Sequence, residues 1–173
     1  MRITIAVLAV IIAGACLQPG ASAQNSGSPK TVQKADIAKA YVWFTSDSWD
    51  SLATLIASDF IDHDPDQGQK PGLDGLKAQF AQYRSTFPDM KLDLKDVLLD
   101  GDIAMTRVEI TGTMNGKMGD MPPNGKKMDV QMFEKLRFKD GKMVERWGVF
   151  DSMKMMTQLG MMPPPGPPPA EKK

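Results

Sequence analysis

An aspartate at the end of an alternating run is the first residue whose surroundings suggest chemistry. Asp151 follows the run from Lys142 to Phe150, which itself follows a turn at Asp140-Gly141. Alternate residues of a strand share a face, so Asp151 is expected on the same side as Trp147. A carboxylate on an apolar face is either a buried acid suited to proton transfer or the cap of the helix expected from Ser152 onward.

His63 is the only histidine in the chain and the second candidate. It could donate a proton or orient a carbonyl group as the partner of Asp151. It could equally be a loop histidine held by Asp62, Asp64 or Asp66. The spacing of these residues matches no closed metal site and lacks the glycine and distal glutamate of a calcium loop, so no metal is expected.

Several further residues could bind an apolar ligand that carries a carbonyl group. Arg107 could reach a carbonyl or carboxylate oxygen of such a ligand, or it could form an ordinary ion pair with Glu109, which shares its strand face. Aromatic residues could line a pocket for a flat molecule, or they could belong to the core. These residues are Trp147, Tyr41, Phe80 and Phe133.

Methionine is unusually frequent, at 14 residues. One group surrounds a loop with two prolines and another lies near the C-terminus. They comprise Met114, Met118, Met121, Met153, Met155, Met156, Met161 and Met162. Clustered thioethers are suited to Cu(I), but no histidine lies near either group, so adaptable packing against a ligand or partner is the favoured interpretation.

An α+β domain must position these residues. Helical spacing of apolar residues predicts two helices within residues 31–57 and a third within residues 74–87, with a short extended piece at residues 58–65. From residue 90 the period falls to two, which predicts four long strands in a meander ending at Phe150. Helices followed by such a meander indicate a curved antiparallel sheet with the helices packed on one face.

The apolar face of one predicted strand allows two interpretations of the oligomeric state. Val130, Met132, Leu136 and Phe138 alternate with polar residues between residues 126 and 139. These apolar side chains could support a homodimer, or they could pack beneath the helices of their own chain.

The two ends of the chain differ from the middle in composition. Residues 1–23 join Arg2 to an apolar run and Ala21-Ser22-Ala23, which is typical of a signal peptide cleaved after Ala23 and predicts a periplasmic or secreted protein. A lipoprotein acylated at Cys16 is the less favoured alternative. Residues 24–30 are expected to be a flexible lead, residues 31–160 the folded domain, and residues 161–173 a proline-rich disordered tail.

Charge and hydropathy argue against nucleic-acid binding and against a transmembrane span. The chain has 21 basic and 21 acidic residues, and the basic ones are scattered, so binding to nucleic acid is not expected. The apolar run of the leader is short and followed by a cleavage site, so no transmembrane span is expected in the mature form.

The order of several short motifs carries a family resemblance. The motifs, between about Ala35 and Gly160, are Phe87-Pro88-Asp89, Asp100-Gly101-Asp102, Gly112-Thr113, Pro122-Pro123-Asn124-Gly125-Lys126, Arg137-Phe138-Lys139-Asp140-Gly141-Lys142, Trp147, Asp151 and Gln158-Leu159-Gly160. This pattern resembles the SnoaL-like polyketide cyclases, also called the ester cyclase family. The resemblance implies the cone-shaped fold of the NTF2-like superfamily, in which a bent sheet wraps a central pocket plugged by helices.

The resemblance also implies an activity. In the family, the pocket holds a polycyclic methyl ester, and an aspartate performs acid-base chemistry in an intramolecular aldol closure without a cofactor. The position that matches this aspartate is Asp151. Many relatives have a histidine after Gly112-Thr113, where this chain has Met114, whose thioether cannot move a proton.

Two functions therefore stay open. One is cofactor-free catalysis on a hydrophobic carbonyl compound, with Asp151 as acid-base and His63 assisting. The other is binding of a small hydrophobic molecule without chemistry. In both, the residues expected around the ligand are Trp147, Arg107, Phe133, Tyr41 and Met114.

Overall fold

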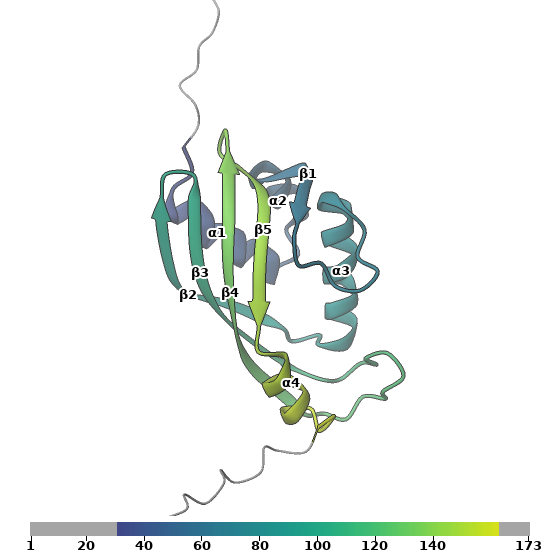
Figure 1. Ribbon diagram of the computed structural model, residues 1–173. Coiled ribbons are helices and arrows are strands. Elements are labelled where there is room, and N and C mark those ends of the chain that lie inside the picture. The colour runs from purple at the N-terminus through teal and green to yellow at the C-terminus, as the bar shows by residue number, and fades with distance from the viewer. Residues whose placement is uncertain (1–30, 163–173) are drawn as a thin grey trace, which may run out of the picture.

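The computed structural model describes residues 31–162, which form four helices and five strands (Figure 1). The elements in chain order are α1 (Lys34–Thr45), α2 (Trp49–Leu55), β1 (Ile56–Asp62), α3 (Gly72–Thr86), β2 (Lys91–Asp100), β3 (Ile103–Thr113), β4 (Lys127–Lys139), β5 (Lys142–Phe150) and α4 (Ser152–Gln158). The expected signal peptide with Cys16, the lead at residues 24–30 and the tail beyond residue 162 lie outside the described residues.

The strands form one curved sheet in the order β1-β5-β4-β3-β2, and α1, α2 and α3 cover one of its faces (Figure 1). The predicted α+β fold with a curved, helix-covered sheet is confirmed. The sheet has a fifth strand, however, because β1 pairs in parallel with β5. That pairing joins segments more than 80 residues apart and is interrupted between Ile56 and Ile61, so local alternation in the sequence could not reveal it.

The turn between β4 and β5 agrees with its sequence. Asp140 and Gly141 both have positive φ, at 51° and 76°, as a tight two-residue hairpin requires. The predicted register of β5 is wrong at one point, because a bulge leaves Val144 unpaired between Met143 and Glu145 and exchanges the two faces of the strand beyond it.

The bulge decides which side chains of β5 face the helices. Met143 points inward, but beyond the bulge Arg146, Gly148 and Phe150 take the inner positions. Glu145 and Trp147 therefore lie on the outer face, so the expected inward placement of Trp147 is wrong.

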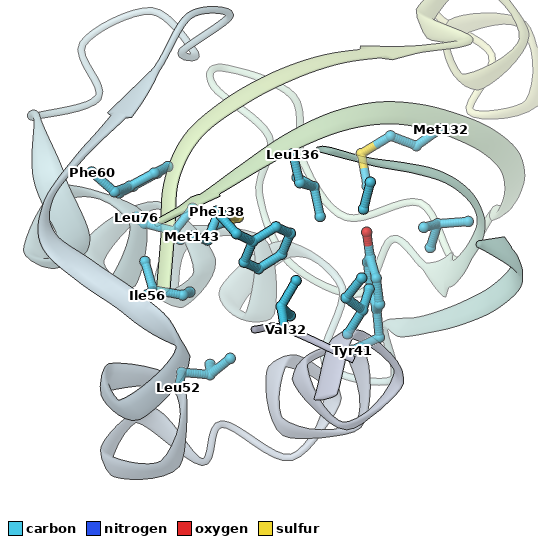
Figure 2. Close-up of a cluster of buried hydrophobic side chains, with 13 residues drawn as sticks. Val32, Tyr41, Leu52, Ile56, Phe60, Leu76, Met132, Leu136, Phe138 and Met143 are labelled. Atoms are coloured by element: carbon cyan, nitrogen blue, oxygen red, sulfur yellow. The ribbon is translucent and has the colours of Figure 1, made fainter. Parts of the chain in front are cut away.

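The main core lies between the helices and the inner face of the sheet, and its buried side chains are drawn in Figure 2. Val130, Met132, Leu136 and Phe138 all belong to the inner face. These residues pack beneath the helices of their own chain, which is one of the two arrangements predicted for them.

A smaller core contains many of the methionines. Its buried members are Phe87, Met90, Met114, Met128 and Leu159, and Met118, Met121, Met155 and Met161 pack against them. The methionines before and after β4 thus meet in one apolar cluster. Within residues 31–162, no helix has the length and apolar character needed to cross a membrane.

Candidate functional site

A cavity of about 670 Å³ lies between the helices and the inner face of the sheet. Most of its wall is apolar, and one end is lined by the methionine side chains of Met90, Met118, Met128 and Met155. A cavity of this size and character suits a small organic molecule.

Three charged side chains meet in the wall of this cavity. Arg146 of β5 donates from Nε to Oε1 of Glu134 on β4, at 2.6 Å, and from Nη1 to both carboxylate oxygens of Asp62 on β1, at 3.0 and 3.1 Å. The side chains of Asp62 and Glu134 are only 7% and 6% exposed. Each of the three comes from a different strand, and the parallel pairing of β1 with β5 places Asp62 directly beside Arg146.

The guanidinium of Arg146 keeps one donor for a ligand. Among residues 31–162, the one hydrogen bond of its Nη2 goes to the sulfur of Met132, at 3.5 Å, and a thioether is a weak acceptor. Gly148 leaves the space that this nitrogen occupies, because a Cβ at that position would lie 2.5 Å from Nη2. Burial alone would lower the pKa of Arg146, but the charges of Glu134 and Asp62 raise it above its ordinary value, so the group stays cationic.

The charges of this cluster do not balance. Two carboxylates share one guanidinium, which leaves one negative charge in excess within a buried wall. One carboxylate is enough to neutralise Arg146, so the other is in excess. Both carboxylates are held on both oxygens. Glu134 accepts from Tyr41, Thr106 and Arg146. Asp62 accepts from Arg146, Gln69 and the backbone N–H of Asp64.

Tyr41 fixes Glu134 from the helical side. Its hydroxyl, carried by α1 toward the sheet (Figure 2), donates to Oε2 of Glu134 and lies 2.9 Å from Oγ1 of Thr106. Burial and then the neighbouring charge of Glu134 raise the pKa of the Tyr41 phenol well above 10.0. The phenol is therefore a neutral donor at physiological pH.

A second polar group lies between the loop after β1 and helix α3. Asp66 accepts hydrogen bonds from Nε2 of Gln79, at 2.9 Å, and from the hydroxyl of Tyr83. Gln69 connects it to the first group, since its Nε2 donates to Asp62 at 3.2 Å while its Oε1 accepts from the backbone of Asp66. Burial and the hydrogen bond to Asp66 raise the pKa of Tyr83.

Both tyrosines of the chain should therefore resist ionisation. In the folded protein, the absorbance of tyrosinate at 295 nm is expected to stay low at pH 10 to 11, whereas the urea-unfolded chain should titrate near the ordinary value of 10.0. Because the folded state holds these protons more tightly, the free energy of unfolding should decline as the pH rises above 10. Titration of either phenol near pH 10 in the folded state would contradict the placement of Tyr41 and Tyr83.

The structure does not bring together the two residues predicted to be catalytic. Asp151 is exposed and caps α4, where its Oδ1 accepts from the backbone N–H of Lys154 at 2.9 Å. His63 lies on the outer face, stacked on Trp147 with ring centroids 4.1 Å apart and hydrogen-bonded to Glu145 at 2.9 Å. Neither Asp151 nor His63 lines the cavity, so the predicted pair is not formed.

Of the residues predicted to bind a ligand, Tyr41 and Phe80 line the cavity. Trp147 and Phe133 lie on the outer face, the latter 49% exposed. Arg107 pairs with Asp96 at 2.6 Å on the same face. Met114 is fully buried in the smaller core. The reversal of the β5 faces accounts for Trp147. Arg107 and Phe133 are paired on β3 and β4, and both point to the face away from the helices.

One of the residues that do meet in the cavity had a signal in the sequence. Glu134 is the one charged residue in the alternating inner positions of β4, between Met132 and Leu136. A carboxylate in such a row must be buried with partners. Arg146 could have been recognised as a partner only if the bulge in β5 and the pairing of β1 had been known.

Comparison with known proteins finds a matching family model and similar solved structures. A family model described as SnoaL-like polyketide cyclase matches residues 35–159. The structure of wild-type IdmH from Streptomyces antibioticus, described as a candidate polyketide cyclase, is 30% identical and superposes with a TM-score of 0.66, covering 73% of this chain and 96% of IdmH. No curated protein matches the chain.

Two further solved structures are similar. A candidate polyketide cyclase from Bacillus cereus ATCC 10987 is 28% identical, with a TM-score of 0.64, and the match covers 73% of this chain and 79% of that one. TsrD from Streptomyces laurentii, at 21% identity, shares the fold with a TM-score of 0.68 over 76% of this chain and 99% of its own.

Proposed function

Because the chain belongs to the SnoaL-like polyketide cyclase family, we propose that it binds a small apolar carbonyl compound in its cavity and moves a proton on that compound without a cofactor. One observation carries the proposal. In the cavity wall, a guanidinium with a donor left for a ligand lies between two buried carboxylates that together exceed its charge.

The proposed chemistry begins with proton removal next to the carbonyl group. Nη2 of Arg146 donates to the carbonyl oxygen, and Asp62 takes the proton from the adjacent carbon. The electron pair of the C–H bond forms a C=C bond while the π pair of the carbonyl group moves onto its oxygen, where Arg146 stabilises the enolate. The enolate carbon then attacks a second carbonyl carbon of the same molecule, and Asp62 returns the proton to the new alkoxide, which makes the closure an isomerisation.

Glu134 and Tyr41 have a positioning role in this scheme. Glu134 holds Nε of Arg146 at 2.6 Å, and Tyr41 holds Glu134. Because Tyr41 stays protonated, it adds no negative charge to the wall when the enolate forms.

Ligand binding without chemistry is the second candidate function. It is favoured by one observation: every carboxylate oxygen of Asp62 and Glu134 already accepts a hydrogen bond from a neighbouring side chain. A protein of this kind would bind apolar carbonyl compounds but leave their protons in place.

Proton exchange separates the two functions without knowledge of the natural substrate. We expect the protein to bind 2-acetonaphthone, measured by fluorescence titration, and to accelerate loss of its methyl proton signal in D₂O, measured by ¹H NMR. Ile110→Phe, which fills part of the cavity, should weaken both. Binding without accelerated exchange would support the second candidate, and absence of binding would refute both.

We also propose that the protein acts outside the cytoplasm. The support is the composition of residues 1–23, with an apolar run followed by Ala21-Ser22-Ala23. Fractionation of cells that express the full chain, with N-terminal sequencing of the product, tests this: an N-terminus at Gln24 in the periplasm or medium is expected, and uncleaved cytoplasmic protein would contradict it.

A further inference from the structure

The titratable residues that line the cavity are strongly unequal in sign. Within the described part of the chain they include five carboxylates and one guanidinium, and neither lysine nor histidine is among them. The carboxylates are Asp36, Asp62, Asp64, Asp66 and Glu134. A wall with this excess of negative charge disfavours a carboxylate or phosphate ligand and favours a cation.

Asp66 is the carboxylate best placed to hold such a cation. It is half-buried, and two neutral donors, Gln79 and Tyr83, hold one of its oxygens, Oδ2. No ion pair among residues 31–162 includes Asp66. By contrast, Asp62 and Glu134 already share Arg146. The charge of Asp66 is thus fixed in the cavity wall without a protein cation to neutralise it.

Aromatic rings surround the same part of the cavity. Tyr83 and Phe80 extend from α3 with ring centroids 5.7 Å apart, and Phe80 stacks on Phe44 of α1 at 4.7 Å. All three rings line the cavity. The negative face of an aromatic ring attracts an ammonium group, and a desolvated site strengthens this attraction.

We propose that the natural ligand carries a basic amine, whose ammonium group binds Asp66 beside the rings of Tyr83 and Phe80. The inference rests on the proposed function and deepens it, since the carbonyl group of the same molecule would reach Arg146. Gln69 connects Asp66 to Asp62 through its side chain, so the amine and the reacting carbon lie along one continuous wall. Ligands that carry a carboxylate are disfavoured by the same excess of negative charge.

Three probes on one ring system test this inference: 2-naphthylmethylammonium, 2-naphthylmethanol and 2-naphthoate. At low salt, the ammonium is expected to bind about tenfold more tightly than the alcohol, because one charge-assisted hydrogen bond changes an affinity by about that factor. The carboxylate should bind most weakly. Asp66→Asn should remove the advantage of the ammonium and leave the affinity for the alcohol unchanged.

The control variant is Asp93→Asn on the outer face of β2, which should change none of the three affinities. Equal binding of ammonium and alcohol by the wild type would overturn the inference, as would a preference that survives Asp66→Asn. If 2-acetonaphthone still undergoes accelerated exchange in that case, the proposed function is retained and only the inference about the amine fails. If no probe binds and no exchange occurs, the proposed function fails together with the inference.

Discussion

Replacing Arg146 with methionine is expected to lower the free energy of unfolding by about 3–5 kcal/mol, measured by urea denaturation followed by circular dichroism. Methionine preserves much of the side-chain length but leaves Asp62 and Glu134 as adjacent buried carboxylates without a counterion. The loss is thus the cost of leaving two desolvated like charges side by side.

Arg107→Met is the matched control for this loss. Arg107 also pairs with an aspartate on the sheet, but its partner Asp96 is 61% exposed, so the variant should lose no more than about 1 kcal/mol. Adding Asp62→Asn and Glu134→Gln to Arg146→Met should recover part of the stability, because the uncompensated charges are then removed. Equal losses for Arg146→Met and Arg107→Met would show that the buried pair is not formed.

Replacing Asp62 with asparagine is expected to lower kcat about 10²- to 10⁴-fold, the usual contribution of a general base. The amide is similar in shape but cannot accept a proton from carbon. The remaining pair of Arg146 and Glu134 is electrically neutral, so the fold and the affinity for 2-acetonaphthone should change little. The measurement is the rate of methyl proton exchange at saturating ligand, with affinity measured separately by fluorescence.

A variant that loses binding and turnover together would not support this role for Asp62. Such a result would mean that asparagine disturbs Arg146 or the loop after β1. Measuring the unfolding free energy of the same variant separates the two cases, since a disturbed ion pair would also lower stability.

Much of the fold was accessible from the sequence because its signals are local. The turn at Asp140-Gly141 requires positive φ at both residues, and alternation in β4 places Met132 and Leu136 on one face. The family motifs gave the overall topology. Helix spacing and strand alternation each depend on neighbours within a few residues, which is why these predictions are confirmed.

The site was less accessible because it depends on two non-local features. A bulge at Val144 reverses the faces of β5, which sends Trp147 outward and Arg146 inward. The parallel pairing of β1 with β5 then brings Asp62 to Arg146 across more than 80 residues. Asp151 lies beyond the end of the strand, where its carboxylate caps α4, the structural alternative that its position before Ser152 had suggested.

The most direct test compares Asp62→Asn and Asp151→Asn by exchange of the methyl protons of 2-acetonaphthone in D₂O. The structure places Asp62 in the cavity wall and Asp151 at an exposed helix cap. We therefore expect exchange to fall at least about 10²-fold in Asp62→Asn and to remain near the wild-type rate in Asp151→Asn. Loss of exchange in Asp151→Asn with retention in Asp62→Asn would contradict the assignment of the cavity wall as the catalytic site.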